Sequence, residues 1–404
     1  MAFYVQKYGG SSVADVEKIR NVAKRIVETY REGNQVLAVV SALGDTTDDL
    51  INFAREVSST HPSREMDLLM STGETMSSAL LAMAIEDLGE SAIALTAHQM
   101  RIQTDESHTK ARIRDINGQR IRQEFEEGKI VVAAGFQGIN EKGDITTLGR
   151  GGSDTTAVAL ASVLDADRCD IFTDVEGVFT ADPNYVEDAH KISAIEYEEM
   201  LELASLGAQV LQVRAVEFGW KYGVDLQVRS TFSDEPGTII TDGGIDMEEV
   251  DVRAVTTDVD QARISVRDVP DRPGIAASLF GALADDNINV DMIVQSSGAT
   301  QQAQNDISFT VSRTDFENAV EITEGTIDEL GGEGVTTDED IAQVSVVGTG
   351  MRNHPGVAKK VFEALGKDDI NIEMISTSEI RISVALQQES VEQAVRVLHR
   401  KFDL

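Results

Sequence analysis

The spacing of apolar and polar positions changes character along the chain. Up to residue 240, continuous apolar runs such as 36–40 and 130–134 alternate with segments in which apolar residues recur every three or four positions. Continuous apolar runs are typical of strands buried on both faces of a parallel sheet, and the longer spacing is typical of helices. We therefore predict an α/β domain over residues 1–240 with a mainly parallel central sheet.

The elements expected in this domain follow one another in a regular order. Strands are predicted at 2–7, 35–44, 91–95, 130–134, 169–172 and 224–228. Helices are predicted to begin near residues 16, 46, 64, 157 and 200, and the helix from 64 to 88 is the longest. The strand at 224–228 is expected to be the last, so that the domain ends near residue 240.

Beyond residue 261 the pattern changes to two shorter units of similar layout. The first unit has strands at 262–268, 289–295, 306–313 and 334–337 and helices at 275–285 and 315–330. The second has strands at 343–348, 371–375 and 380–386 and helices at 357–366 and 390–402. Pro273-Gly274 in the first is matched by Pro355-Gly356 in the second. These units form an internal repeat of the βαββαβ type.

The second copy of the repeat stops at Leu404 without its final strand. The stretch 251–256, which precedes the first copy, has the composition of a strand. We expect it to supply the missing edge strand, which makes the second unit discontinuous in sequence. Residues 241–251 are rich in acids and include Gly243 and Gly244, as is typical of a linker.

The first strand ends in a lysine and two glycines, Lys7-Tyr8-Gly9-Gly10, and a helical segment follows. Glycines let backbone N–H groups approach an oxygen-rich ligand, and the first turn of a helix adds unpaired N–H groups and a positive dipole end. With the charge of Lys7, this layout suits a phosphate. A Gly-Gly pair also occurs at ordinary turns, and the chain has neither a P-loop nor a dinucleotide fingerprint, so any phosphate chemistry belongs to another architecture.

Polar residues at later strand ends and helix starts add candidate ligands. Ligands of open α/β sheets bind at the carboxyl ends of strands, which places Ser41 and Thr47 well, although each alone would also serve as a helix cap. Glu74 lies between apolar runs of the helix 64–88. It is either solvated or turned inward, and an inward carboxylate needs a partner such as a substrate ammonium.

A second glycine-rich helix start lies at 149–156 and contains both Arg150 and Asp154. Arg150 can hold a carboxylate or phosphate with two parallel hydrogen bonds. Asp154 would either cap the helix or orient the ammonium of Lys7. Further along, residues 173–184 interleave carboxylates and turn residues with apolar ones, a pattern that suits loops around a nucleotide.

Composition limits the classes of partner and compartment. The chain has 35 Lys+Arg and 70 Asp+Glu, a formal net charge of −35, so nucleic acid would be repelled. The dispersed acidic surface fits either a high-salt cytoplasm or an ordinary acidic enzyme. The single cysteine, Cys169, excludes an internal disulfide framework and is expected to be buried. Without an evident signal peptide or an apolar run approaching the ~20 residues of a membrane span, we expect a cytoplasmic protein that does not engage a membrane.

Together these motifs resemble those of aspartate kinases, members of the amino-acid kinase superfamily with two C-terminal ACT domains. The resemblance covers nearly the whole chain and rests on the repeat and on the motifs at 7–12, 72–74, 149–154 and 174–183. It implies an α/β amino-acid-kinase αβα sandwich over 1–240, a linker with a donated edge strand over 241–261, and ACT domains over 262–340 and 341–404.

The resemblance also implies a reaction and roles for individual residues. An aspartate kinase uses ATP to phosphorylate the side-chain carboxylate of L-aspartate, giving 4-phospho-L-aspartate in the first step toward lysine, threonine and methionine. Lys7 would stabilise the transferred phosphoryl group and Asp154 would orient Lys7. Glu74 would bind the substrate ammonium and Arg150 its α-carboxylate, with Ser41 and Thr47 near the reacting groups.

The nucleotide would be ATP, with Mg²⁺ bridging its phosphates and no metal ligand assigned to the protein. The residues implied in nucleotide binding come from both glycine-rich segments and from the loops after residue 172. They are Lys7, Tyr8, Gly9, Gly10, Gly151, Gly152, Ser153, Thr173, Asp174, Phe179, Thr180, Ala181, Asp182, Pro183 and Asn184.

The ACT resemblance implies amino-acid effectors at paired ACT edges, and hence a homo-oligomer. Threonine is expected near Asp271, Gly274, Ala276, Gln295, Asn371 and Ile372, with lysine as a co-inhibitor. The second copy has Asn353-His354 where the first has Asp271-Arg272, so it lacks the aspartate that would meet an effector ammonium. The segment 297–304 would further alter the effector pocket.

Three alternatives stay open. The glycine codons before Met247 would allow a ribosome-binding sequence and a separate regulatory chain of 404 − 247 + 1 = 158 residues, or Met247 is an ordinary linker residue. The substrate could be glutamate or N-acetylglutamate, although an acetylated amine needs no carboxylate partner such as Glu74. The chain could instead be a non-catalytic amino-acid sensor, which intact Lys7, Asp154, Glu74 and Arg150 argue against.

Overall fold

The computed structural model describes residues 2–208, 210–243, 252–297, 304–352, 354 and 356–404. Met247, Gly244, Asn353, Pro355 and residues 298–303 therefore lie outside the described residues. The chain forms two compact units. Unit 1 comprises Met1–Val178, Lys191–Ser205 and Gln209–Ile245, and unit 2 comprises Phe179–His190, Leu206–Ala208 and Asp246–Leu404. Two short segments within the range 1–240 thus belong to unit 2.

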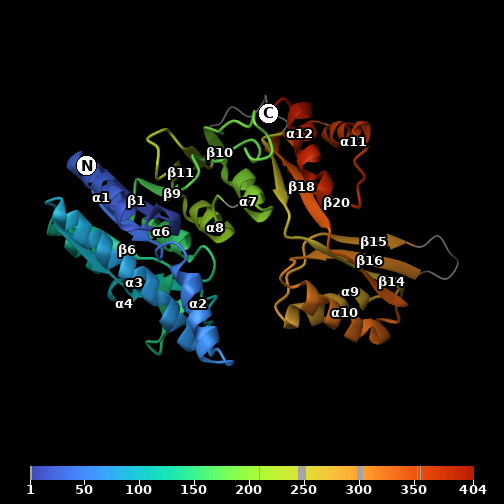
Figure 1. Cartoon of the computed structure of the whole chain (residues 1–404), viewed down its shortest axis with the longest axis horizontal. Helices are drawn as coiled ribbons and strands as arrows, with labels where there is room; N and C mark the ends of the chain where they lie inside the picture. Colours follow the sequence, from blue (N-terminus) through green and yellow to red (C-terminus); the bar gives the residue numbers. More distant parts are fainter. Residues whose placement is uncertain (1, 209, 244–251, 298–303, 353, 355) are drawn as a thin grey trace. The chain divides into compact units, whose positions relative to one another are not determined.

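Unit 1 is built on an eight-stranded sheet with the order β10-β12-β11-β9-β1-β2-β6-β3. Figure 1 labels β1, β6, β9, β10 and β11 of this sheet. The predicted parallel arrangement is confirmed for six strands, whereas β12 and β10 at one edge run the opposite way. The strands are β1 (Phe3–Tyr8), β2 (Gln35–Val40), β3 (Ala92–Leu95), β6 (Ile130–Ala134), β9 (Arg168–Thr173), β10 (Ala194–Glu196), β11 (Leu226–Ser230) and β12 (Thr238–Thr241). The expectation that the strand at 224–228 is the last was wrong, because β12 pairs with β11 beyond it.

Helices cover both faces of this sheet. On one face, α1 (Val16–Arg31) and α3 (Ser63–Asp87) pack on apolar side chains of the sheet such as Val36, Ala38 and Val132. On the other face, the almost fully buried α6 (Gly152–Leu164) packs against β1, β2 and β9. Neighbouring residues of a strand point to opposite faces, so Lys7 faces α6 while Tyr8 joins the core under α1.

The remaining helices and a small second sheet complete unit 1. The helices are α2 (Thr46–Val57), α4 (Ala97–Met100), α5 (Gln119–Glu126), α7 (Tyr197–Ser205) and α8 (Val213–Tyr222). The small sheet has the order β5-β4-β7-β8, from β4 (Ile102–Thr104), β5 (Ile113–Ile116), β7 (Gln137–Ile139) and β8 (Ile145–Thr147). Sequence analysis missed this sheet because strands of three or four residues are too short to show a period.

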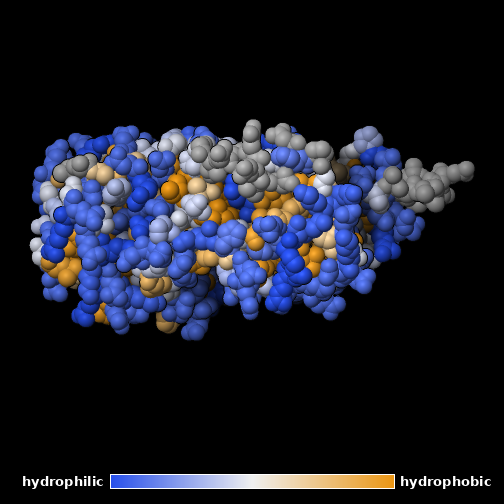
Figure 2. Space-filling view, turned by 90° about the horizontal axis from the view of Figure 1, so that it is seen from above, coloured by the Kyte–Doolittle hydropathy of each residue, from blue (hydrophilic) through white to orange (hydrophobic). Residues whose placement is uncertain are grey.

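The long helix α3 has the length and apolar composition of a membrane span, which the sequence analysis did not anticipate. Half of its most apolar window is buried inside the structure, and its buried face includes Asp67 and Glu74. A core helix of a globular domain passes the same test, and α3 has the contacts of such a helix. Most of the surface in Figure 2 is hydrophilic, as the net charge of −35 leads one to expect.

Unit 2 contains two four-stranded antiparallel sheets. One has the order β15-β16-β14-β17, formed by β14 (Ala262–Pro270), β15 (Ile293–Ser297), β16 (Gln304–Val311) and β17 (Gly334–Asp338) with helices α9 (Ile275–Asp285) and α10 (Phe316–Leu330). The other has the order β13-β18-β20-β19, formed by β13 (Ala254–Asp258), β18 (Ile341–Val347), β19 (Met374–Thr377) and β20 (Arg381–Gln387) with helices α11 (Val357–Lys367) and α12 (Val391–Phe402).

The strand β13 lies in the edge position that the repeat leaves open. It precedes the first copy in sequence but pairs antiparallel with β18 of the second, with Ala254 opposite Val347 and Asp258 opposite Gln343. Its partner β18 is buried along its whole length, so an uncovered edge here would leave backbone groups without partners. Pairing with β13 satisfies them.

The segment Phe179–His190 is anchored to the same sheet. The N–H of Val255 donates to Thr180 O at 2.8 Å, and Ala181 and Val186 pack into the core formed with α11 and α12. The Thr180 hydroxyl lies 2.9 Å from His399 Nε2 and accepts the N–H of His190 at 3.2 Å. Burial lowers the pKa of His399 below its usual range.

The anchoring hydroxyl can be removed with little change in volume. Thr180→Val leaves His399 Nε2 and the His190 N–H without this partner, at a cost of about 1–3 kcal/mol for buried polar groups. We expect the Tm of the transition that unfolds unit 2 to fall by several degrees in calorimetry. Thr336→Val, at an exposed position of β17, is the control and should change that Tm by less than about 1 °C. Equal Tm values for the two variants would show that the hydroxyl does not hold the segment.

Candidate active site

The carboxyl end of β1 carries an ion pair between two largely buried groups. Lys7 Nζ lies 2.6 Å from Asp154 Oδ1, and the two side chains are 11% and 10% exposed. Asp154 is the third residue of α6, whose N-cap is Gly151 with a left-handed φ of +67° and no side-chain cap. The Asp154 carboxylate is thus engaged by the lysine, and the start of α6 keeps free N–H groups for a ligand.

The two glycines after Lys7 lie against neighbouring backbone. The Gly9 N–H donates to Phe172 O at 3.2 Å, and a Cβ on Gly10 would lie 3.0 Å from Ala42 O and 3.1 Å from Gly44 O. A side chain at position 10 would therefore push the end of β2 away. Residues Gly10–Ser12 form a short 3₁₀ turn next to Lys7.

The expected contribution of the next helix to a phosphate site was wrong. α1 does not follow the glycines directly, and the Asp15 carboxylate caps it by accepting the Lys18 N–H at 2.9 Å. Glu17 adds a second negative charge in the first turn. A helix start that already holds carboxylates does not favour a further anion, so α6, and not α1, offers its N-terminus to the site.

Tyr8 is placed so that its side chain cannot reach a ligand. The ring is fully buried, stacks on Phe172 with centroids 4.8 Å apart, and donates its hydroxyl to Gln6. Its carbonyl accepts the Ser41 N–H at 3.1 Å. Any role of Tyr8 in nucleotide binding would be through the backbone and through holding the ends of β1 and β2 together. Cys169, on the adjacent β9, is buried as expected.

Glu74 is turned inward from α3 and has one unpartnered oxygen. Its side chain is 3% exposed, its Oε1 accepts the Ala42 N–H at 3.1 Å, and its Oε2 has no hydrogen-bond partner among the residues that the structure describes. Burial raises the pKa of this carboxyl to about 7. Gly73 permits the approach, since a Cβ there would lie 2.7 Å from Ala42 Cβ. A buried oxygen of this kind needs a hydrogen-bond donor, and a cationic donor would also favour the ionised carboxylate.

Ser41 and Thr47 lie at the same end of the sheet. Ser41 follows β2 directly, and Thr47 is the second residue of α2. Within the described ranges neither hydroxyl has a hydrogen-bond partner, and both side chains are partly exposed. The N-cap of α2 is Asp45, which makes no side-chain cap bond, and the hydroxyl of the first helical residue, Thr46, donates to Leu43 O. Both hydroxyls are therefore free to meet a ligand.

Arg150 lies in the loop between β8 and α6. It is exposed, and the described part of the chain provides no hydrogen bond or ion pair to its guanidinium. The loop itself is fixed: Arg214 donates to Leu148 O at 2.6 Å, and Gly149 and Gly151 take left-handed φ values of +79° and +67°. A Cβ on Gly151 would overlap the Gln212 side chain, so this position requires glycine.

Packing contacts join these groups into one region of unit 1. Gly10 and Glu74 both meet Ala42, and Lys7 meets Asp154. Gly135, at the end of β6, fits between Ser153 and Val40, since a Cβ there would lie 2.8 Å from Ser153 and 3.0 Å from Val40 O. The structure thereby brings the ends of β1, β2 and β6 together with α3 and the start of α6. Gly151 is the N-cap of α6 and Gly152 is its first residue.

The residues implied around the nucleotide fall into both units. Thr173 ends β9 and Asp174 follows it in unit 1, with the Thr173 hydroxyl donating to Asp174 at 3.1 Å. Phe179 to Asn184 belong to unit 2. The side chains of Thr180 and Ala181 are buried in its core, whereas those of Asp182, Pro183 and Asn184 are exposed. The side chains of Thr180 and Ala181 therefore face protein.

Four of the six residues expected around threonine line one cavity of unit 2. Its volume is about 340 Å³, and it is bounded by the β14–α9 loop and strands β15 and β16, including Asp271, Gly274, Ala276 and Gln295. Asn371 and Ile372 do not line it. The Asn371 amide donates to Glu373, and Ile372 packs against the core of the second sheet.

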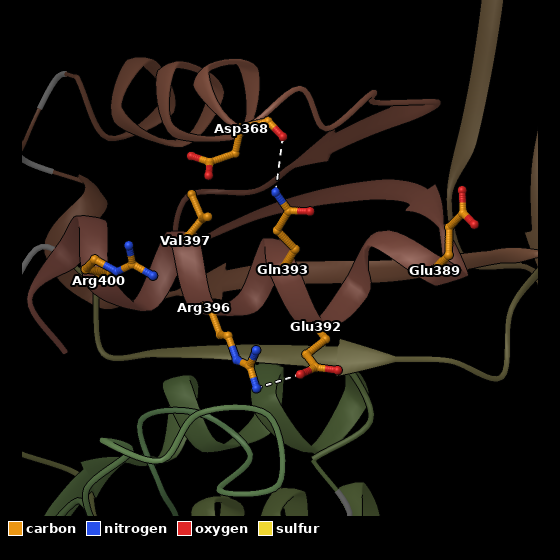
Figure 3. Close-up of a pocket in the computed structure, with 7 residues that line it drawn as sticks. All are labelled: Asp368, Glu389, Glu392, Gln393, Arg396, Val397 and Arg400. Atoms are coloured by element: carbon orange, nitrogen blue, oxygen red, sulfur yellow. Dashed lines mark hydrogen bonds and ion pairs between the residues drawn. The ribbon is translucent and has the colours of Figure 1, made fainter.

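A second groove, of about 370 Å³, runs beside α12 and contains none of the predicted residues (Figure 3). Three of its polar side chains already have partners within the protein. Arg396 contacts Glu392 and donates to Tyr185 O, and Gln393 donates to Asp368 O. No cluster of three or more His, Cys, Asp or Glu residues able to hold a metal ion occurs in the described ranges.

Sequence reasoning missed one buried cluster near the loop of Arg150. Asp67 of α3 is fully buried and bonded to His108, Thr109 and Thr147. A signal was present, because Asp67 lies seven residues before Glu74 and therefore on the same helical face. Its partners are distant in sequence and have no motif that would identify them.

Comparison with known proteins gives matches over both units. A model of the amino acid kinase family matches residues 2–230, and one of the ACT domain matches 263–325 and 344–402. An aspartate kinase of Stutzerimonas stutzeri is 48% identical over 405 residues, covering 100% of this chain and 98% of that protein. An aspartokinase of Mycolicibacterium smegmatis is 49% identical over 407 residues, covering 100% and 97%.

Solved structures match as well. E. coli aspartokinase III in complex with aspartate and ADP, in the R-state, has a TM-score of 0.83 and 26% identity, with 100% of each chain covered. The same enzyme in complex with lysine and aspartate, in the T-state, has a TM-score of 0.77 and 26% identity, with 99% of each chain covered.

The raised pKa of Glu74 predicts how stability depends on pH. Since the folded pKa of about 7 lies above the ordinary 4.5, stability associated with this group is lost as pH rises from 4.5 through 7. Glu74→Gln removes the charge and should stabilise the protein at pH 8.5 by about 1–3 kcal/mol, with a smaller gain at pH 5. Calorimetric Tm values across this range give the comparison.

The matched control is Glu86→Gln, at an exposed position of the same helix. It should leave Tm within about 1 °C of wild type at every pH. A Tm difference between Glu74→Gln and wild type that does not change with pH would contradict a raised pKa at Glu74.

Proposed function

The chain belongs to the amino acid kinase family as an aspartokinase with ACT domains, and from this we propose that it converts L-aspartate and ATP to 4-phospho-L-aspartate and ADP. The observation that carries the proposal is the buried Glu74 carboxylate with its unpartnered oxygen. A free α-ammonium supplies the cationic donor that this oxygen lacks. The product would serve as the first intermediate toward lysine, threonine and methionine.

Aspartate would be held by its two α-substituents. Glu74 would bind the ammonium, and the unengaged guanidinium of Arg150 would bind the α-carboxylate with two parallel hydrogen bonds. Holding both groups leaves the side-chain carboxylate as the free end of the substrate. The unpartnered hydroxyls of Ser41 and Thr47 would line its path to the phosphate.

The transfer itself needs little covalent chemistry from the protein. An oxygen of the side-chain carboxylate attacks the γ-phosphorus, a P–O bond forms, and the bond to the β-phosphate oxygen breaks, which releases ADP. The carboxylate is ionised, so no proton has to be removed. Lys7 would offset the charge that develops on the transferred group, and Asp154 would hold its ammonium in place at 2.6 Å.

The region around Lys7 fits a nucleotide triphosphate. Without a side chain, Gly10 lets the turn after β1 pack closely against Ala42 O and Gly44 O, and the uncapped start of α6 offers the N–H group of Ser153 next to Asp154, while the Gly152 N–H donates to Gly149 O. Mg²⁺, held mainly through the phosphates, would neutralise part of their charge. Gly9, Thr173 and Asp174 would complete the site in unit 1, and the part of Phe179 to Asn184, which belong to unit 2, stays a prediction from the sequence. E. coli aspartokinase III has been solved with aspartate and ADP.

We further propose that threonine and lysine inhibit the enzyme through the ACT domains. The cavity at Asp271, Gly274, Ala276 and Gln295 has a carboxylate for an effector ammonium and a size that suits a small amino acid. Asn371 and Ile372, which lie elsewhere in unit 2, would contribute from a paired ACT domain. E. coli aspartokinase III has been solved with lysine.

A homo-oligomer through ACT edges follows from the same reasoning. The edge strands β15 and β19 expose Ile293 and Ile375, which are 52% and 45% exposed. Exposed apolar side chains on edge strands are a site for pairing with another chain. A separate chain starting at Met247 would contain both ACT domains and stays a proposal from the sequence. We also propose a cytoplasmic location and no nucleic-acid partner.

Other amino-acid kinase substrates fit Glu74 less well. An N-acetylated amine is neutral and would leave the Glu74 oxygen without a cation. Glutamate keeps the ammonium but extends the chain by one methylene group, which would change the position of the reacting carboxylate relative to the two α-substituents. A non-catalytic sensor would have no need for the buried Lys7–Asp154 pair.

The direct test is hydroxamate formation from aspartate, ATP, Mg²⁺ and hydroxylamine, at low and at high salt. We expect turnover with aspartate, none with N-acetylglutamate, and a lower rate when threonine and lysine are added. Turnover without inhibition would retain the kinase and reject these effectors. A folded protein without turnover at any salt concentration would reject the proposed reaction in favour of a sensor or of another substrate.

Glu74→Gln tests the substrate contact in the same assay. Removing one partner of a buried charge pair costs about 2–5 kcal/mol, so the KM for aspartate should rise by more than tenfold while the KM for ATP changes little. Glu86→Gln is again the control and should leave both values unchanged. Equal KM values for aspartate in wild type and Glu74→Gln would exclude Glu74 as the ammonium ligand.

A further inference from the structure

Asp67 is a fully buried carboxylate whose hydrogen bonds all come from outside its own helix. Its Oδ2 accepts from His108 Nδ1 at 2.7 Å, its Oδ1 accepts from the Thr147 hydroxyl at 2.6 Å, and the Thr109 N–H donates to both oxygens at 3.0 and 3.1 Å. A carboxylate without exposed surface keeps its place only while its oxygens are satisfied. Asp67 therefore ties α3 to the loop 105–111 and to β8.

The same contacts continue from Thr147 to Arg150. Thr147 is the last residue of β8, and its carbonyl accepts the Ala111 N–H at 2.9 Å. Two residues further on, Gly149 packs on the loop 105–111, since a Cβ there would lie 3.1 Å from Thr109 O. The backbone that leads to Arg150 thus rests on residues that Asp67 holds.

Arg214 closes this arrangement from the other side. Its guanidinium donates to Leu148 O at 2.6 Å and to Ala111 O at 3.2 Å, so it joins the same two segments. Burial lowers the pKa of Arg214. The guanidinium of Arg150, by contrast, has no partner in the described ranges and is exposed. The loop backbone is fixed on both sides while the Arg150 side chain stays available.

Asp67 and Glu74 lie on the same buried face of α3, seven residues apart. This separation is two helical turns, or about 10 Å along the axis. One rigid helix therefore carries both the carboxylate for the substrate ammonium and the carboxylate that holds the arginine loop. The spacing of the two binding charges depends on α3 and on the bonds that Asp67 makes.

We propose that Asp67 and His108 form a positioning pair that sets Arg150 at the distance from Glu74 that aspartate requires. The proposal rests on the proposed function for the roles of Glu74 and Arg150. His108 is the member of the pair to substitute, because its side chain is 17% exposed whereas that of Asp67 is fully buried. In this proposal Glu74 and Arg150 bind the substrate, and the effect of Asp67 and His108 on aspartate passes through the loop.

The test compares two substitutions of His108. His108→Ala removes the Nδ1–H donor, whereas His108→Asn keeps a donor at nearly the same distance from the backbone. We expect His108→Ala to raise the KM for aspartate by about tenfold, with kcat and the KM for ATP within twofold of wild type. His108→Asn should restore the KM for aspartate to within about threefold. His61→Ala, at an exposed position before α3, is the control and should behave as wild type.

A second readout follows the loop itself. Hydrogen exchange of residues 145–152, measured by mass spectrometry, should be faster in His108→Ala than in wild type and normal in His108→Asn. If His108→Ala changes neither the exchange nor the KM for aspartate, the proposal is wrong. If it raises both KM values alike and lowers kcat, the pair supports the fold in general and does not position Arg150.

The two readouts also separate this proposal from the one it rests on. If wild-type protein does not turn over aspartate, the proposed function fails. The exchange rates then decide alone whether the pair holds the loop: faster exchange in His108→Ala with recovery in His108→Asn supports it, and unchanged exchange overturns it.

Discussion

Burial of charge is the constraint on which the active region of unit 1 depends. A charged side chain removed from water must find a partner, or its pKa moves until the charge is lost. Lys7 and Asp154 satisfy each other at 2.6 Å, and Asp67 is satisfied by three donors. Glu74 is the exception, because one of its oxygens has no partner and its pKa is raised to about 7. A substrate ammonium would donate the hydrogen bond that this Glu74 oxygen lacks.

The sheet explains why these groups meet in one place. Parallel strands end at the same edge, so Lys7 on β1, Ser41 after β2 and Gly135 after β6 are brought together although they lie far apart in sequence. The helix α3 packs against this edge through Gly73, and α6 begins there. In unit 2, β18 forms backbone hydrogen bonds with β13 at the edge of its sheet, and the backbone of β13 in turn bonds to the segment Phe179–His190. Residues implied in nucleotide binding are thus held by an ACT-type sheet.

Much of this arrangement could be predicted from the sequence. Long apolar runs give the parallel strands, the repeat gives the two small domains, and the missing strand of the second copy points to the stretch before residue 260. The place of Glu74 between apolar runs left a solvated and an inward position open, and the structure turns its side chain inward. The short strands β4, β5, β7 and β8 could not be found, because three or four residues show no period. The Asp67 cluster could not be found either, because its partners meet only after the chain has folded. The capping of α1 by Asp15 could not be predicted, because it depends on the residue at which the helix begins.

The central claim is that one oxygen of the buried Glu74 carboxylate lacks a hydrogen-bond partner until an ammonium group binds there. The most direct measurement is the titration of its carboxyl carbon by NMR, with the Glu74→Gln spectrum to assign the signal, in the free protein and with saturating aspartate. The account predicts a pKa of about 7 in the free protein and a value at least one unit lower when aspartate is bound, because the ammonium favours the ionised form. A pKa near 4.5 in the free protein, or one that aspartate does not change, would contradict it.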